Sequence, residues 1–281
     1  MIVIKNEFIT AKFNEIGAEL KSLKCDDYEY IWGGREDSWN RSCPILFPIC
    51  GGLNDNKYVF CGKEYTLSKH GFLRDKSFEI EQIADDSVIF LSKSDADTKR
   101  RFPFDYELRV VYKLIGKSLK IDYCVKNKTD ATMYFSIGSH EGYNTPDGIE
   151  NYDVVFPQKE SLNAIVLCGN SLSHDKLPII KDSNVLSLDE KYFSVDALIF
   201  DDLKSHAATL KNRKSGREIN VKFPDDDYFL IWHTPGAPFI CLEPWSGIPD
   251  YVDATGDITE KAGIIKLSAG KEYKHTHTIS V

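Results

Sequence analysis

The feature that most constrains the fold is a long stretch in the middle of the chain where apolar and polar residues alternate. Between Leu108 and Lys126, apolar side chains recur at every second position on both sides of the link Ile115-Gly116-Lys117-Ser118. A period of two around a short Gly-containing link predicts a β-hairpin. The aromatic content of 12%, with 14 Tyr and 16 Phe against 2 Met, also favours strands, because aromatic side chains pack well on a pleated surface.

Short extended runs of the same kind recur along the whole chain. Predicted strands fall at Ile2–Ile9, Lys76–Ile83, Val88–Ser92, Thr132–Ile137, Ala197–Phe200, Glu218–Phe223, Phe229–Trp232, Phe239–Leu242 and Gly263–Leu267. The sequence contains no Gly/Ser-rich or Pro-rich linker and no repeat of fixed period. This pattern predicts an all-β fold, a large antiparallel β-sandwich with few short helices, built as a single domain over residues 1–281.

Charge and cysteine content restrict the partners and the compartment. The 281 residues carry 35 Lys and Arg against 43 Asp and Glu, a formal net charge of -8. An acidic chain gains nothing from counterion release, so binding to nucleic acid is not expected. Apolar runs are far shorter than the roughly 20 residues of a membrane span, and neither a signal peptide nor a CxxC pair is present. We expect a cytoplasmic protein with reduced thiols, without membrane partners, and a monomer or homodimer.

Two clusters in the first third of the chain combine basic residues with apolar segments. Arg41 leads into the run Pro44–Cys50, whose two prolines argue against a long regular strand. In Lys69–Arg74, a glycine beside His70 permits close backbone approach, and Arg74 adds a planar donor. Each cluster also fits a structural role, as an Arg that caps a core segment or as a tight turn.

Two later clusters place an ionisable residue at or beside a strand. His140 follows the predicted strand Thr132–Ile137 in a glycine-containing loop, and loops held by a rigid sheet often carry catalytic groups. Glu243 interrupts an apolar strand, and Pro244 holds it in an extended conformation. A buried, unpaired carboxylate is costly, so its pKa should rise toward the range of a general base. Trp245 is either a core residue or a platform for the apolar face of a sugar.

Metal and cofactor sites have little support in the sequence. His275 and His277 alternate near the end of the chain and would share a strand face, so both could ligate one ion. Because no further ligand stands nearby in the sequence, we expect two exposed histidines on a final strand instead. Glycine-rich phosphate-binding motifs are also missing from the sequence. Neither a metal nor a cofactor is therefore expected.

Taken in order, the four clusters resemble the aldose 1-epimerase, or galactose mutarotase-like, family, and within it a LacX-like bacterial branch. The matching pieces are GAEL at Gly17–Leu20, then R…PILFP…G, HGF.R, IG.H and a late C.EPW that ends at Trp245. The resemblance implies a large antiparallel β-supersandwich. It also implies a reaction without a cofactor, the interconversion of the α and β anomers of a free aldohexose.

The resemblance further implies a role for individual residues. Glu243 matches the general base that removes the proton of the anomeric O1 hydroxyl, and His140 matches the general acid that protonates the ring oxygen. A protonated His140 with an ionised Glu243 is then the expected active state, with a bell-shaped pH profile. His70 matches a second His that hydrogen-bonds the sugar near its ring oxygen. Asp196 is the expected substrate-binding Asp, with Asp201 as the alternative.

The sequence leaves the substrate and the class of function open. A related branch handles hexose 6-phosphates, and Arg41 and Arg74 fall where two of its phosphate-binding residues would lie. Those two arginines equally fit a role in orienting Glu243. Glu141 stands where many relatives have Pro, which could reshape the pocket or add a carboxylate beside His140. A non-catalytic carbohydrate-binding module and a glycoside hydrolase, which needs two carboxylates, are the alternatives to an epimerase.

Overall fold

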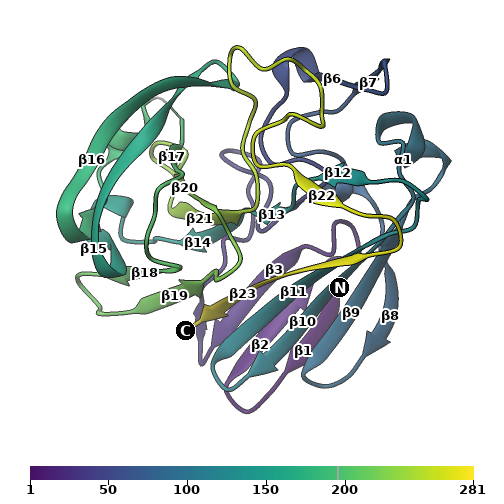
Figure 1. The fold of residues 1–281 in the computed structure, drawn as a ribbon. Helices are drawn as coiled ribbons and strands as arrows, with labels where there is room; N and C mark the ends of the chain where they lie inside the picture. The colour runs from purple at the N-terminus through teal and green to yellow at the C-terminus, as the bar shows by residue number, and fades with distance from the viewer. Residues whose placement is uncertain (195) are drawn as a thin grey trace.

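The computed structural model describes residues 1–194 and 196–281 and confirms an all-β fold of antiparallel sheets. A nine-stranded sheet runs through the molecule (Figure 1). In spatial order its strands are β16 (Ser171–Ser187), β15 (Tyr152–Cys168), β18 (Ala207–Asn212), β19 (Glu218–Lys222), β23 (Glu272–Ser280), β11 (Ser118–Asn127), β10 (Tyr106–Ile115), β9 (Ser87–Lys93) and β8 (Glu79–Ile83).

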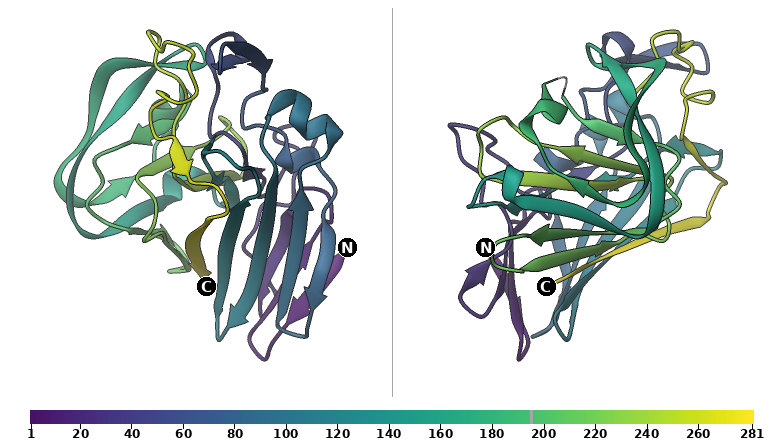
Figure 2. Two further views of the ribbon diagram at one scale, coloured as in Figure 1. Left: turned by 45° about the vertical axis from the view of Figure 1, so that its right-hand side comes forward. Right: turned by 90° about the vertical axis from the view of Figure 1, so that its left-hand side faces the viewer.

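Two smaller sheets cover the two ends of this sheet. The four-stranded sheet contains β1 (Ile2–Lys5), β2 (Ile9–Phe13), β3 (Leu20–Cys25) and β4 (Tyr28–Glu29). The six-stranded sheet contains β17 (Leu198–Phe200), β20 (Tyr228–Trp232), β21 (Phe239–Trp245), β13 (Gly138–Ser139) and β5 (Ile45–Leu46), with β14 (Glu141–Asn144) also paired to β21. The first lies against β9–β11, whereas β15 and β16 curve around the second (Figures 1 and 2).

The remaining elements are short. Two strand pairs stand apart from the large sheets, β6 (Lys57–Phe60) with β7 (Lys63–Thr66) and β12 (Met133–Phe135) with β22 (Ile265–Leu267). The helical segments are α1 (Ala96–Arg101) and the 3-10 turns η1 (Asn54–Asn56), η2 (Leu73–Asp75), η3 (Ile149–Asn151) and η4 (Glu190–Phe193). Within the described residues, no helix has the length and apolar character that a membrane crossing requires.

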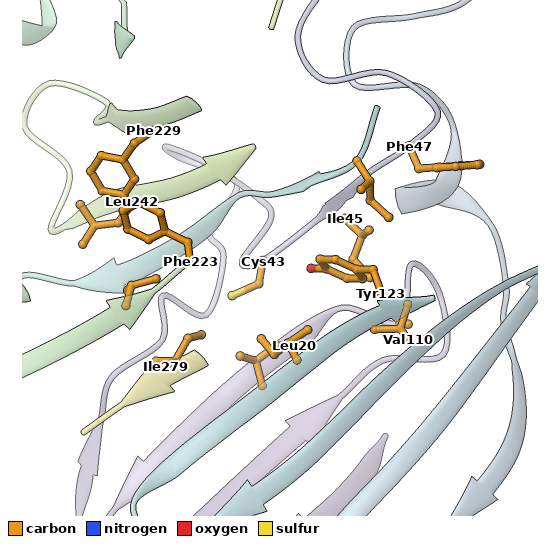
Figure 3. Close-up of a cluster of buried hydrophobic side chains, with 14 of the residues drawn as sticks. Leu20, Cys43, Ile45, Phe47, Val110, Tyr123, Phe223, Phe229, Leu242 and Ile279 are labelled. Carbon is orange, nitrogen blue, oxygen red and sulfur yellow. The ribbon is translucent and has the colours of Figure 1, made fainter. Parts of the chain in front are cut away.

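The sheets enclose one continuous cluster of buried apolar side chains, part of which is shown in Figure 3. At the four-stranded end, Phe13 packs against Tyr112 with ring centroids 4.4 Å apart. At the other end, Phe223 stacks on Phe229 with centroids 4.8 Å apart. All four side chains belong to the same cluster, which therefore extends along the nine-stranded sheet.

The predicted hairpin is confirmed, but the longest strands of the molecule were not predicted. β10 and β11 pair from Tyr106↔Asn127 to Ile115↔Ser118, and their inward side chains are buried at alternate positions. β15 and β16 have 17 residues each, and their pairing shifts register several times. Polar residues and a proline in each strand hide the period of two, so only the tertiary pairing reveals this hairpin.

The expectation that His275 and His277 are exposed is wrong. β23 is an interior strand that pairs with both β11 and β19, and both histidines are fully buried. His275 Nε2 lies 2.5 Å from Asp226 Oδ1, and His277 Nε2 lies 2.7 Å from Glu141 Oε1. Each histidine therefore belongs to a buried ion pair or hydrogen-bonded pair between elements distant in the sequence.

Candidate active site

The pairing of two short strands with β21 positions the central residues of the site. β13 and β14 share one antiparallel register with β21, in which Gly138 lies opposite Trp245 and His140 falls opposite Glu243. Because side chains in extended strands alternate between faces, His140, Glu243 and Trp245 point to the same side of the six-stranded sheet. His140 Nδ1 is 3.4 Å from Glu243 Oε2. The short strands after Ile137 thus place the predicted acid and base side by side.

These side chains face a pocket of about 370 Å³. Loops and strands from much of the chain contribute to its wall: Trp39, Pro44, Gly51, Lys69, His70, Arg74, His140, Leu167, Gly169, Asn170, Asp196, Ala197, Ile199, Leu230, Trp232, Glu243, Trp245 and Pro249. A pocket of this size, apolar for the most part with a few convergent polar groups, is typical of a small-molecule site.

The structure brings together most of the predicted site residues, but it places Arg41 and Asp201 elsewhere. Asp196 lines the pocket, whereas Asp201 forms an ion pair with Lys176 at 2.5 Å. Arg41 is absent from the pocket wall, and its Nη2 donates to Asp75 Oδ1 at 2.6 Å. Between the two aspartates considered, the geometry therefore favours Asp196.

Glycines on either side of His140 give two tryptophan rings room to approach. A Cβ atom at Gly138 would lie 2.7 Å from Trp245 Cδ1, and one at Gly142 would lie 2.8 Å from the Trp39 ring. Trp39 stacks on the His140 imidazole with centroids 4.8 Å apart and planes 27° apart. The two glycines therefore matter for the close packing that fixes the histidine ring and the Trp245 indole.

Burial controls the protonation of the acid–base pair. Glu243 is 1% exposed and His140 9%. Burial, with smaller effects of Lys69 and Arg74, lowers the pKa of His140 to about 3, while burial raises the pKa of Glu243 well above its ordinary value. Both shifts favour the uncharged form of each group. The expected active state, protonated His140 with ionised Glu243, therefore requires one proton to move within the pair.

His70 is held as a neutral hydrogen-bond donor. The backbone N–H of Gly51 donates to His70 Nδ1 at 3.2 Å, which fixes Nδ1 as the acceptor. Burial lowers the pKa of His70 well below its ordinary value, so the neutral ring carries its proton on Nε2. The ring packs edge-on against His140 and Trp245, with centroids 5.6 and 5.4 Å away. This imidazole can therefore donate to a sugar oxygen.

Charged groups at the pocket wall carry both signs. Lys69 Nζ lies 3.8 Å from Asp196 Oδ2, and Arg74 Nη2 donates to the carbonyl oxygen of Lys69 at 3.0 Å. Glu141 lies outside this group, because it points to the opposite face of β14 and pairs with His277. It is therefore not a carboxylate of the pocket.

Several pocket residues were missed by the sequence analysis. Trp39, Trp232 and Asn170 carry no local motif, and only the fold brings them to the pocket. Lys69 lies beside His70 in one of the predicted clusters, so its position in the sequence predicts that it lies near the pocket. Cys241 stands two residues before Glu243, so strand alternation alone places its side chain on the same face.

The fold and the site together define a β-supersandwich of the galactose mutarotase-like type with a buried His–Glu pair in an aromatic-walled pocket. The chain belongs to the aldose 1-epimerase family, whose model matches residues 1–280. It is 34% identical over 295 residues to the plasmid-encoded protein LacX of Lactococcus lactis subsp. lactis, covering 100% of this chain and 99% of the relative.

Solved structures of similar proteins agree with this assignment. The galactose mutarotase related enzyme from Lactobacillus acidophilus is 33% identical, with a TM-score of 0.95 and coverage of 99% of this chain and 96% of that chain. A galactose mutarotase-like protein from Lactobacillus casei ATCC 334 is also 33% identical, with a TM-score of 0.94 and coverage of 100% and 99%. The similarity thus extends over the whole fold.

Proposed function

We propose that the protein is an aldose 1-epimerase that interconverts the α and β anomers of an aldohexose by opening and reclosing the sugar ring. The observation that carries this proposal is the buried His140–Glu243 pair, with Nδ1 and Oε2 3.4 Å apart, in a pocket large enough for one sugar. Membership of the aldose 1-epimerase family supports it. Opening a hemiacetal requires one group to accept a proton while another donates one, which this pair provides.

The reaction redistributes one proton across the pair. In the reactive complex, ionised Glu243 removes the O1 proton while protonated His140 delivers a proton to the ring oxygen O5. The C1–O5 bond breaks, the O1–C1 electrons form the aldehyde, and both protein groups become neutral. Rotation about C1–C2 and the reverse transfers give the other anomer. Burial favours the neutral pair, so the protein environment stabilises the ring-opened state relative to the two separated charges.

The other pocket residues fit positioning roles. The Nε2–H of His70 is a fixed donor for an oxygen near the ring, and Asp196 is an acceptor for sugar hydroxyls. The indoles of Trp39, Trp232 and Trp245 provide flat apolar surfaces that suit the C–H face of a sugar. Holding the ring between such groups converts acid–base transfer into an intramolecular step.

Polarimetry with freshly dissolved anomers of several aldohexoses tests the proposal. The expected result is equilibration faster than the spontaneous rate, with no product other than the second anomer. Calorimetric binding without any acceleration would instead indicate a carbohydrate-binding module. Release of reducing ends from an oligosaccharide would indicate a glycoside hydrolase. Spontaneous rates for every sugar tried would contradict the epimerase proposal.

A hexose 6-phosphate is a second candidate substrate, favoured by one observation. Lys69 and Arg74 both line the pocket, and Arg74 Nε is buried without a hydrogen-bond partner. A cationic group so placed suits a phosphate. Arg74→Met should then raise KM at least tenfold for the phosphorylated sugar and little for the free one. Arg109→Met is the control, because Arg109 pairs with Glu81 and lies outside the pocket wall. An equal effect of Arg74→Met on both sugars would contradict phosphate recognition.

A further inference from the structure

The acid–base pair has a third potential metal ligand beside it. A ring nitrogen of His140, the Sγ atom of Cys241 and a carboxylate oxygen of Glu243 all lie within 4.8 Å of one another. Cys241 and Glu243 are two residues apart on β21, and the strand register brings His140 opposite Glu243. The three donor types, imidazole, thiol and carboxylate, are those that bind zinc in proteins.

Two polar atoms in this group lack hydrogen-bond partners. His140 Nδ1 and Glu243 Oε2 are both buried and unpaired, although they face each other at 3.4 Å. Buried polar groups are almost always satisfied, so an unpaired pair aimed at one point indicates that another group binds there. Neighbouring ligands in a tetrahedral zinc site with bonds of roughly 2.0–2.1 Å to N and O are about 3.4 Å apart. The separation of His140 Nδ1 and Glu243 Oε2 matches that spacing. A Zn–S bond of about 2.3 Å requires Sγ roughly 3.6 Å from both atoms, which is closer than the 4.8 Å within which the three ligand atoms lie, so Cys241 must move inward on binding.

We propose that His140, Cys241 and Glu243 form a binding site for a thiophilic divalent cation of the Zn²⁺ type. The thiol selects against Mg²⁺ and Ca²⁺, which prefer oxygen ligands. Three protein ligands leave a fourth position toward the pocket for water or a sugar hydroxyl. On binding, a metal–sulfur bond replaces the S–H bond of Cys241, and the single proton of the acid–base pair also leaves to the buffer.

A cation at this position is an inhibitor of the acid–base chemistry. It occupies the lone pairs with which His140 and Glu243 exchange protons, so bound cation and turnover exclude each other. This inhibitory consequence rests on the proposed function, whereas cation binding does not. The two statements therefore need separate measurements.

Cadmium titration followed by the near-ultraviolet absorption of the Cd²⁺–thiolate bond tests binding directly. The protein used is the full chain with Cys61→Ser and Cys168→Ser, because these are its two exposed thiols. The expected result is a thiolate band that saturates at one equivalent and is lost in Cys241→Ser. His140→Asn and Glu243→Gln, which keep the thiol, should each weaken Cd²⁺ affinity at least tenfold. Cys43→Ser is the matched control, because Cys43 is another buried cysteine, and it should keep the band.

The outcomes separate the cation site from the epimerase proposal. A band that persists in Cys241→Ser, or affinity unchanged in both His140→Asn and Glu243→Gln, overturns the cation site. If binding is confirmed, Zn²⁺ should inhibit mutarotation with an inhibition constant equal to its dissociation constant, and EDTA should reverse the inhibition. Metal binding in a protein that accelerates no sugar's mutarotation would leave the cation site standing and remove the epimerase proposal.

Discussion

At the scale of single residues, the environment of Glu243 and His140 matters more than their identity. Either side chain exposed on a loop would titrate near its ordinary pKa. Here, burial shifts the two pKa values in opposite directions, so the pair shares one proton over a wide pH range. Pairs of titratable groups whose environments separate their pKa values are a recurring sign of acid–base catalysis.

Replacing Glu243, the proposed base, should remove activity without removing the fold. Glu243→Gln keeps the size of the side chain but cannot accept a proton, so anomer interconversion should fall by about 10² to 10⁴. Polarimetry gives the rate, and far-UV circular dichroism gives the fold. Trp232→Phe, at another pocket residue, controls for general disturbance of the pocket and should lose less. A Glu243→Gln protein with an unchanged rate would contradict the assignment of the base.

The pH profile of kcat/KM should be broad. A second proton on the pair stops the reaction, and this occurs only below the lowered pKa of His140, which is about 3. Loss of the single proton also stops the reaction and produces the fall in rate on the high-pH side. The raised pKa of Glu243 moves this fall above the ordinary carboxyl pKa of about 4.3. The acid limb should therefore lie far below pH 6.5, the ordinary value for histidine. Rates measured by polarimetry across the acid and neutral range check this. Activity that is lost on acidification with a midpoint near pH 6.5 would contradict it.

At the scale of elements, strand alternation decides what each residue of the His140 motif contacts. His140 faces the pocket, and the next residue, Glu141, faces the interior and meets His277 of β23 at 2.7 Å. The sequence places these two ionisable groups side by side, which suggested a second carboxylate near the acid. The pleat sends them to opposite faces, so Glu141 joins two sheets instead.

This contact should contribute to stability. Glu141→Leu leaves the His277 imidazole buried without its partner, at a cost of about 1–3 kcal/mol in the free energy of unfolding. Glu141→Gln keeps an acceptor oxygen and should lose less. Urea unfolding of the three proteins measures the difference. Equal stabilities of the Leu variant and the parent protein would show that the contact contributes nothing.

At the scale of the whole molecule, we propose that the chain folds as a single domain. The nine-stranded sheet spans both ends of the structure, and one apolar cluster extends from Ile4 to Ile279. The four tryptophans lie on or near the pocket side, where Trp32 and Trp39 stack on Phe239. Their fluorescence therefore reports mainly on the six-stranded sheet and the pocket.

A cavity in the four-stranded end should thus destabilise the pocket end. Phe13 is fully buried and packs on Tyr112 and Phe90, so Phe13→Ala should cost about 3–5 kcal/mol. If the chain is one cooperative unit, melting curves from tryptophan fluorescence and far-UV circular dichroism should shift downward together. If the midpoint of the fluorescence transition is unchanged while the midpoint of the circular dichroism transition falls, the chain consists of two independent units.

The sequence by itself determined the all-β class and the β10–β11 hairpin, and it predicted most of the candidate site, because these depend on local patterns. Alternation is visible within one strand, and motifs such as those around His70, His140 and Glu243 are contiguous. The pairing of β15 with β16, the burial of His275 and His277 and the position of Asp196 in the pocket wall depended on the tertiary structure. So did the approach of Trp39 to the His140–Glu243 pair. The physical reason is that register and sheet order bring together residues far apart in sequence, and burial, which sets each pKa, exists only once they meet.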